Sequence, residues 1–230
     1  MNQTNQGETI VTKYEEAAEY VRQVGILPLA SCIPEFPSLE SITRKESWHS
    51  GTEDDPWTWR TRFPYEGKAG YGKFMKKKAF LISAEWFPLV YACLGMGRDA
   101  ETSYQDGLLS GTAWELYQLI DIDQGIDTRA LRERAHMKAV EDKKDFDRAV
   151  LELQETMLIV ISGVKSKVNE AGEINGWSST AYETTMHWMK QNGIQKTSCS
   201  KQEAGQQLLA RLQDGCSSKA FAYFKKIFQQ

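Results

Sequence analysis

Residues 143–162, KKDFDRAVLELQETMLIVIS, join a helical pattern to a strand pattern without a break. The first part places Phe146, Ala149, Val150 and Leu153 three and four positions apart, which predicts a helix near 143–155. The second part, near 157–162, is an apolar run rich in isoleucine and valine, which predicts a strand. The junction between them is the centre of the predicted fold.

The elements on both sides of this junction complete one unit across residues 110–183. Apolar spacing upstream predicts two helices, near 110–123 and 128–136. Downstream, a turn region rich in lysine, asparagine and glycine leads to a second strand near 177–182. Three helices followed by a strand, a turn and a strand are typical of a winged helix-turn-helix, whose third helix enters a DNA groove. The same unit can also serve as a packing or protein-contact module.

We therefore predict a mainly α fold with short β hairpins, containing either one winged helix-turn-helix or two in tandem. Residues 1–98 are expected to form an N-terminal region of helices and loops packed on the rest. Residues 99–230 are expected to hold the winged-helix domain and the C-terminal helices. Within the first region, Pro28 interrupts the apolar run 26–30, so that run is expected to be extended but not a central strand.

Composition sets limits on the class of protein. With 230 residues, of which 41% are hydrophobic, the chain can bury a core of ordinary size. Residues 1–9 are polar and lack the pattern of a signal peptide. No apolar run approaches the ~20 residues needed to cross a bilayer. We therefore expect a cytoplasmic protein with no membrane partner.

Cysteine and histidine are too scattered to predict a metal site. No pair has the spacing of a zinc knuckle, and a cytosolic chain is not expected to carry disulfides. The residues concerned are Cys32, Cys93, Cys199 and Cys216, with His49, His136 and His187. We expect neither a metal nor a cofactor.

Charge is distributed unevenly along the chain. Residues 55–98 hold 8 basic and 3 acidic side chains, and residues 157–230 hold 9 and 5. Residues 99–156, which include the three predicted helices of the winged unit, hold 7 and 14. DNA affinity comes mainly from basic groups on phosphates, so DNA binding would require the two basic regions to line one channel. Separate solvated faces are the alternative, and the oligomeric state stays open.

Within the winged unit, the cations of the third helix and of the wing are the candidate DNA contacts. Those of the helix would contact phosphates or base edges, and those of the wing would contact phosphates. The candidates are Lys143, Lys144 and Arg148 in the helix and Lys165 and Lys167 in the wing.

The densest aromatic stretch contains residues 54–62, DDPWTWRTR. Asp55 followed by Pro56 is typical of a helix start. Trp57 and Trp59 cannot share one helical face, so one can pack inward while the other borders a surface. A tryptophan beside arginines could stack an exposed base and hold its phosphate. The alternative is that both tryptophans are buried and that Asp55 only caps the helix.

A cleft is predicted around these tryptophans. Its stacking residues would be Trp57 and Trp59, and its cations would be Arg60, Arg62, Lys76, Lys77 and Lys78. The lysine run could equally be a solvated edge with no binding role. For acid–base chemistry, the weak candidates nearby are His49, Glu53 and Asp55.

Several segments together resemble the AlkZ-type DNA glycosylases, and in particular the shorter AlkZ-related proteins. They are Trp59-Arg60, Gly72-Lys73-Phe74, the run 78–83, the run 128–132 and the helix–strand junction 146–161. The resemblance extends over roughly residues 11–228. It implies tandem winged helices and the removal of alkylated or crosslinked bases from DNA.

The catalytic signature that this resemblance implies is absent. The family signature is a glutamine, a hydrophobic residue and a glutamine or aspartate just after the first helices, whereas residues 25–30 here read GILPLA. A leucine cannot position the water that cleaves a glycosidic bond, so no catalytic residue carries over. Three hypotheses follow: a non-catalytic winged-helix DNA-binding protein, a glycosylase-like enzyme with a displaced site, and a protein- or small-molecule-binding module on the same fold.

Overall fold

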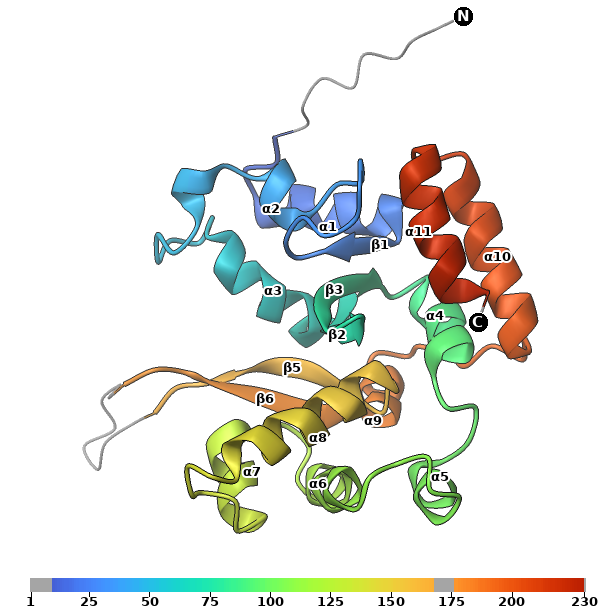
Figure 1. Cartoon of the computed structure of the whole chain (residues 1–230). Helices are drawn as coiled ribbons and strands as arrows, with labels where there is room; N and C mark the ends of the chain where they lie inside the picture. Colours follow the sequence, from blue (N-terminus) through green and yellow to red (C-terminus); the bar gives the residue numbers. More distant parts are fainter. Residues whose placement is uncertain (1–9, 168–175, 230) are drawn as a thin grey trace, which may run out of the picture.

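The computed structural model describes residues 10–167 and 176–229. This part of the chain is mainly helical and contains two small, three-stranded antiparallel sheets (Figure 1). The prediction of a mainly α fold with short β hairpins is thereby confirmed. Among the described helices, none has the length and apolar character that crossing a membrane requires.

The first sheet and its helices form what we call the N-terminal repeat, residues 14–83. Its elements are α1 (Tyr14–Val24), β1 (Ile26–Pro28), α2 (Leu39–Ile42), the 3-10 helix Lys45–Ser47, α3 (Pro56–Tyr65), β2 (Ala69–Met75) and β3 (Lys78–Ser83). The strands lie in the order β1-β3-β2, so β1 is an edge strand, as Pro28 predicts. Lys76 and Lys77 form the two-residue turn between β2 and β3, and both have positive φ, 48° and 61°.

The second sheet and its helices form the C-terminal repeat, residues 111–184. Its elements are α6 (Gly111–Ile122), β4 (Ile126–Asp127), α7 (Thr128–Arg134), α8 (Lys143–Glu155), β5 (Ile159–Lys165) and β6 (Ser179–Thr184). The strand order is β4-β6-β5. Apart from the short 3-10 helix of the first, both repeats therefore show the same succession of helix, strand, helix, helix, strand and strand, with the last strand in the middle of the sheet.

The predicted helices of the C-terminal repeat agree with the structure to within two residues, but both hairpin strands begin two residues late. The reason lies at the end of α8. Met157 has a φ of 55° and donates its N–H to the Gln154 carbonyl, while the Leu158 N–H bonds to the Leu153 carbonyl. This turn ends the helix before the extended chain starts at Ile159, and the second strand shifts to stay in register.

The two repeats pack against each other reciprocally. The third helix of each repeat contacts the first hairpin strand of the other, α3 on β5 and α8 on β2, and the two strands also contact each other. The Gln154 Oε1 accepts a 2.9 Å hydrogen bond from the Lys73 N–H. Just after the C-terminal repeat, the indole N–H of Trp188 donates to the Pro64 carbonyl at 2.8 Å. Each third helix is thus partly covered by its neighbour's hairpin.

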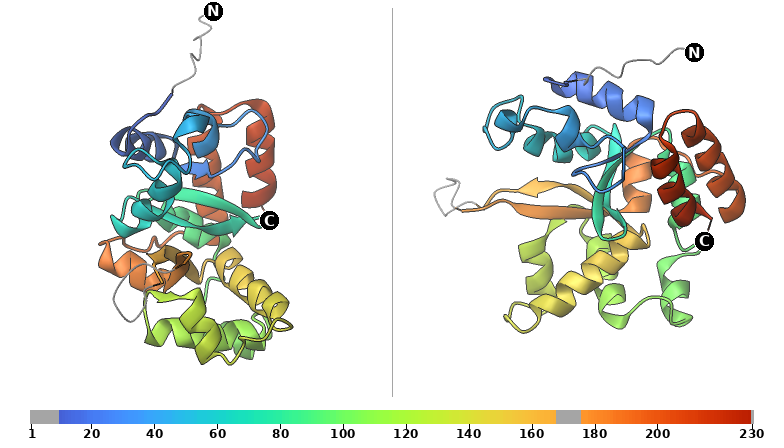
Figure 2. Two further views of the ribbon diagram at one scale, coloured as in Figure 1. Left: turned by 90° about the vertical axis from the view of Figure 1, so that its left-hand side faces the viewer. Right: turned by 45° about the horizontal axis from the view of Figure 1, so that its top comes forward.

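The remaining helices cover the side of the molecule away from the long β5–β6 hairpin (Figures 1 and 2). They are α4 (Phe87–Leu94), α5 (Ala100–Gln105), α9 (Thr185–Gln191), α10 (Lys201–Gln213) and α11 (Ser218–Phe228). Helix α10 packs on α4 and on α11. The approach is closest at Gly205, where a Cβ would lie 2.3 Å from the Phe228 carbonyl oxygen.

Two groups of buried side chains result from this packing. One joins the two repeats and includes Trp59, Phe63 and Phe146. The other surrounds α4 and includes Phe87, Trp188 and Phe224. The first group contains residues from both sides of Gly97, so the repeats share a core.

Candidate nucleic-acid interface

A stack of three side chains lies at the start of α3. The guanidinium carbon of Arg60 is 3.7 Å from the centroid of the Trp57 ring, and the His49 ring is 4.8 Å from that ring. Trp57 is 41% exposed, so part of its surface remains open to solvent. One of the two tryptophans therefore borders the surface beside an arginine, as the sequence suggested.

Arg60 is a half-buried cation with unused bonding capacity. Its Nε is buried and has no hydrogen-bond partner in the part of the chain that the structure describes. Burial lowers the pKa of Arg60, while the neighbouring Tyr71 hydroxyl and Asp55 act in the opposite direction. A buried guanidinium N–H without a partner is unusual, and an acceptor from a ligand would satisfy it.

Each repeat contributes one buried tyrosine, Tyr71 from β2 and Tyr182 from β6. Tyr71 lies beside Arg60, and Tyr182 of β6 bonds to Thr128 at 3.4 Å. Burial raises the pKa of both tyrosines, so their hydroxyls stay protonated and can donate hydrogen bonds.

Trp59 does not stack on a ligand, which corrects the prediction for this residue. It is 1% exposed, and its indole N–H donates to the Glu53 carbonyl at 2.9 Å. The two tryptophans lie two residues apart, so they lie on different faces of α3. Trp59 belongs to the core, and only Trp57 remains a stacking candidate.

Asp55 is a structural carboxylate and not an available acid or base. One oxygen accepts the N–H groups of His49 and Trp57, each at 2.9 Å, and the other accepts that of Gly51 at 3.1 Å. The side chain caps α3 and holds the preceding loop against it. The side chains of His49 and Glu53 are exposed, so these two stay candidates.

Arg62 and the lysine run lie away from Trp57, so the predicted cleft does not form as a whole. Arg62 bonds to Glu66 at the end of α3 at 2.6 Å, and its guanidinium lies 3.8 Å from the ring of Tyr14 in α1. Lys76 lies at the tip of the β2–β3 hairpin, with its Nζ 4.6 Å from the ring of Tyr223 in α11.

Lys77 and Lys78 also lie beside other parts of the molecule, away from Trp57. The Lys77 N–H donates to Glu155 at 3.0 Å, and Lys78 is close enough to Cys32 to act on the pKa of that thiol. Of the predicted cations, only Arg60 accompanies Trp57.

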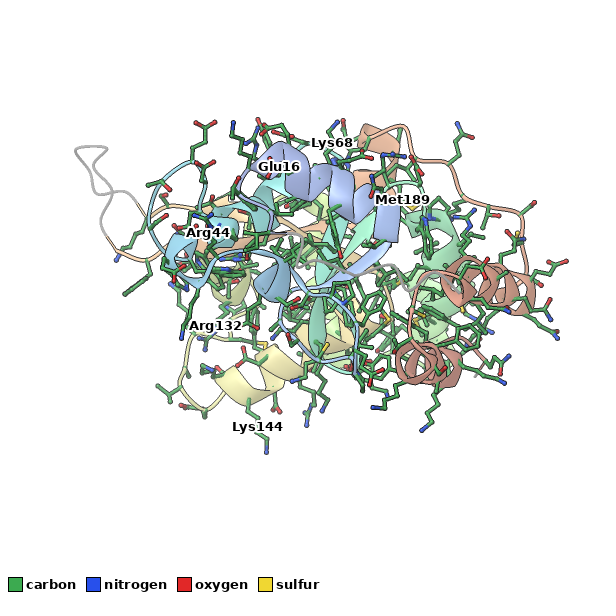
Figure 3. The ribbon with its side chains drawn as sticks, turned by 90° about the horizontal axis from the view of Figure 1, so that it is seen from above. Glu16, Arg44, Lys68, Arg132, Lys144 and Met189 are labelled. Carbon is green, nitrogen blue, oxygen red and sulfur yellow. The ribbon has the colours of Figure 1, made fainter. Side chains whose placement is uncertain are left out.

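The exposed cations of α8 are mostly neutralised by the helix itself. Lys143 pairs with Asp147 at 2.8 Å, and Arg148 pairs with Asp145 at 2.7 Å. Lys144 has no such partner within the described ranges and projects into solvent at the edge of the molecule (Figure 3). Lys68 lies at the opposite edge in the same view. The helix thus offers one unpaired cation where the sequence suggested three.

Arg129 bonds to the β5–β6 hairpin near the ends of its strands that lead toward residues 168–175. Arg129 of α7 donates to the Lys165 carbonyl at 3.0 Å and to the Trp177 carbonyl at 2.9 Å. The side chains of Lys165 and Lys167 are exposed, and Trp177 is 94% exposed. Two cations and an unburied tryptophan therefore project from the strands that lead toward residues 168–175.

Sequence reasoning missed Tyr71, Arg129 and Trp177 in these surroundings. Trp177 carried a usable signal, because a tryptophan directly after Gly176 in a polar turn has little chance of burial. Tyr71 and Arg129 carried no such signal. Tyr71 matters because it lies beside Arg60, and Arg129 because it bonds to the β5–β6 hairpin, and only the fold brings these partners together.

The stretch in the position of the family's catalytic signature lies in the core. Ile26 and Leu27 are fully buried in β1, which pairs with β3. Gly25 just before it has a φ of 75°, and a Cβ there would lie 2.1 Å from the Trp86 ring. No carboxylate or amide is presented from this position. Among residues 10–167 and 176–229, no three His, Cys, Asp or Glu side chains gather as metal ligands would.

Comparison with known proteins identifies the family. A family model described as AlkZ related matches residues 11–229. No curated protein and no solved structure matches the chain. The matched region includes both repeats and the C-terminal helix pair, and the chain therefore belongs to the AlkZ-related family.

Proposed function

We propose that this chain binds DNA through tandem winged helices and does not cleave glycosidic bonds. The observation that carries the proposal is the repeated order of helix, strand, helix, helix, strand and strand, with the same strand order in both sheets. A winged helix has this succession, and its third helix and hairpin are the parts that meet DNA. Membership of the AlkZ-related family supports a relationship to DNA glycosylases.

The arrangement of the two third helices favours contact by their first turns. The C-terminal part of α8 is covered by β2, through Gln154 and Glu155. Helices α3 and α8 both begin on the side toward which the β5–β6 hairpin projects (Figure 1). DNA on that side would meet Trp57 and Arg60 from α3, Lys144 from α8, and Lys165 and Lys167 from the hairpin.

The chemistry of these side chains suits a duplex with one accessible base. Lysines on the hairpin and on α8 would neutralise phosphates regardless of sequence. The Trp57 side chain is 41% exposed, and Arg60, whose guanidinium lies over its ring, adds an unused N–H. The base of an unstacked nucleotide could stack on Trp57 and accept a hydrogen bond from Arg60. Lys143 and Arg148 would contribute less, because Asp147 and Asp145 already neutralise them.

The absence of catalysis is inferred from the residues at hand. Base removal needs a group that positions water or stabilises the sugar cation, and β1 offers only buried apolar side chains. Asp55 is occupied by three backbone N–H groups. The simplest function for such a member of a glycosylase-related family is recognition without cleavage.

Binding to duplex DNA at several salt concentrations tests the proposal. Changing Lys165 and Lys167 to alanine should weaken binding about equally across sequences and flatten the salt slope by roughly two units, one for each lost phosphate contact. The matched control changes Lys68 and Lys190, two exposed lysines outside the candidate interface, and should leave the slope unchanged. Equal slopes in the two double variants would remove the hairpin from the interface.

Trp57 tests the stacking role separately. Trp57→Leu should lower affinity for DNA with an unpaired base more than affinity for fully paired DNA, with little change in melting temperature. Trp59→Leu is the contrasting variant, because its target is buried and its loss should mainly lower stability. If Trp57→Leu affects both DNAs alike, the tryptophan does not receive a base.

Release of alkylated or crosslinked bases separates recognition from cleavage. The intact chain should bind such DNA and release no base. Base release above the uncatalysed rate would favour the displaced-site enzyme, and loss of that release in Glu53→Gln or in His49→Ala would locate it. Absence of any salt-dependent DNA binding would instead favour a protein- or small-molecule-binding module.

A further inference from the structure

A pocket lies on the side of the molecule opposite the projecting end of the β5–β6 hairpin. It has a volume of about 840 Å³ and is bounded by α4, the 95–99 segment, Tyr117 of α6 and the segment before α10. Helices α4 and α5 lie opposite the projecting end of β5–β6 (Figure 1). Ligand pockets commonly measure ~300–1,000 Å³ and occur between packed helices, as this one does between α4, the C-terminal repeat and the start of α10.

The wall of this pocket is positively charged. It contains the cations Arg98, Lys196 and Lys201 and one carboxylate, Asp99. Arg98 pairs with Asp106. Lys196 and Lys201 have no ion-pair partner elsewhere in the described chain, and the Nζ of Lys196 lies 5.7 Å from the centroid of the Tyr91 ring. Two unpaired cations in one concavity favour an anionic ligand.

Asp99 does not compete for those lysines. Its two oxygens accept the N–H and the hydroxyl of Thr102, each at 2.8 Å, and so begin α5. These bonds hold the pKa of Asp99 below its usual value, so the carboxylate stays charged and committed to the helix. The lysines remain available to a ligand.

A row of stacked aromatic rings ends at the pocket. Tyr104 and Trp114 are nearly parallel, 12° apart with centroids 5.7 Å apart. Trp114 and Tyr117 follow at 15° and 6.0 Å, and Tyr117 lines the pocket. Burial, followed by Asp121, raises the pKa of Tyr117 to about 12, so its hydroxyl remains a hydrogen-bond donor. A planar ligand in the pocket would extend this row by one ring.

We propose that this pocket binds a nucleoside 5′-phosphate, with the base against Tyr117 and Tyr91 and the phosphate on Lys196 and Lys201. The shared chemistry is a planar base joined to a terminal phosphate, and it has two possible sources. One is a free nucleotide, and the other is the 5′-phosphorylated end of a strand. The site lies away from Trp57 and Arg60, so it does not depend on the proposed DNA interface.

Calorimetric titration of the intact chain tests the site. The four ribonucleoside monophosphates AMP, GMP, CMP and UMP are titrated separately, beside adenosine, ribose 5-phosphate and a short 5′-phosphorylated oligodeoxynucleotide. At least one nucleotide should bind more tightly than adenosine and than ribose 5-phosphate, because each of those lacks one half of the recognised group. Binding of the oligonucleotide alone would identify a strand end as the source, and binding of the mononucleotide would identify the free form.

Substitutions assign any binding to the pocket. Lys196→Met with Lys201→Met should raise the Kd about tenfold or more, through the loss of charge-assisted hydrogen bonds to phosphate. Tyr117→Leu should also raise the Kd, with circular dichroism confirming that the chain is folded. Lys68→Met with Lys190→Met is the control and should leave the Kd unchanged. Failure of all four nucleotides and of the oligonucleotide, equal binding of adenosine, or an unchanged Kd in the lysine pair variant would each overturn the proposal.

Discussion

The two repeats share one topology but divide the chemistry of the candidate interface between them. The N-terminal repeat has a hairpin closed by a two-residue turn, and its third helix presents Trp57 with the half-buried cation Arg60 over its ring. In the C-terminal repeat, β5 ends at Lys165 and β6 begins at Ser179, and two of the three cations of its third helix are paired with carboxylates of that helix. The same succession of elements thus supplies a stacking surface in one copy and a projecting hairpin in the other. The topology alone does not determine which repeat supplies the stacking surface and which supplies the projecting hairpin.

Trp188 of α9, directly after the C-terminal repeat, gives the largest test of how tightly the N-terminal repeat is held to the rest of the chain. It is 1% exposed, packs on Phe87 and bonds to the Pro64 carbonyl of α3. Trp188→Ala should lower the free energy of unfolding by about 3–5 kcal/mol, because a large buried side chain leaves a cavity. Chemical denaturation measures this.

Trp177 is the matched control for Trp188. It is 94% exposed, so Trp177→Ala should change the free energy of unfolding by no more than about 0.5 kcal/mol. Both variants should unfold in a single transition, since the repeats share a core. Two separated transitions in either variant would mean that the repeats fold independently.

Gln154 carries the polar part of the contact between repeats. It is 3% exposed, and its Oε1 accepts the Lys73 N–H at a point where the ladder between β2 and β3 is irregular. Gln154→Ala should cost about 1–3 kcal/mol, because a backbone N–H loses its partner. Glu155→Ala is the comparison, since it removes an exposed bond to the Lys77 N–H and should cost less. Equal losses in the two variants would show that burial does not matter at this contact.

The tight hairpin turn of the N-terminal repeat is conformationally costly. Lys76 and Lys77 both have positive φ, for which asparagine and glycine are the favoured residues of a two-residue turn. Lys76→Asn with Lys77→Gly should raise the free energy of unfolding by about 1 kcal/mol. Thermal denaturation measures the gain, and Lys73→Asn, at an exposed strand position of the same hairpin, should not show it. A loss of stability would mean that the contact of Lys76 with Tyr223 outweighs the strain.

The smallest expected effect concerns the start of the first helix in each repeat, which is capped by a different glutamate in the two cases. At α1, the Glu16 carboxylate accepts the N–H groups of Thr12 and Lys13, and these bonds lower its pKa from the usual 4.5. At α6, Glu152 reaches from α8 to the Ser110 N–H and hydroxyl. A lowered pKa in the folded state stabilises the chain above the unfolded value and is lost as the pH falls below it.

Glu16→Gln should therefore be slightly less stable than the parent chain near neutral pH. The difference should shrink as the pH falls from 4.5 through the lower pKa of the folded chain, where the carboxylate becomes protonated. Urea denaturation across that range is the measurement. A difference that is independent of pH would show that the charge of Glu16 does not contribute to the cap.

Capping residues and apolar spacing predicted the helices and strands well. Contacts between residues far apart in the sequence could not be predicted in this way. Ser110 and Asp127 begin their helices with side-chain caps, and the helices near 111–122, 128–134 and 143–155 follow from caps and apolar spacing. Asp55 before Pro56 likewise predicted the start of α3. These signals act within a few residues, so one sequence is enough to detect them.

The candidate site was only partly accessible from sequence for the opposite reason. That Trp57 and Trp59 face different ways follows from helical geometry, but which of them is buried depends on the neighbours of α3. Lys76 contacts Tyr223 of α11, which lies far along the chain. The repetition of the helix–strand unit likewise leaves no periodic pattern in the sequence. A run of like charges therefore appeared to be one surface, although the fold directs its members to different neighbours.

The packing of α10 on α4 has a consequence for the order in which the chain is made. A ribosome releases residues 87–94 long before residues 201–213, so the apolar side chains of α4 lack their final cover during most of synthesis. Residues 218–228 must also arrive before the close contact at Gly205 can form. Partly made chains expose this surface and are the state most prone to aggregation. Productive expression of this protein should thus depend on how fast its last helices are translated.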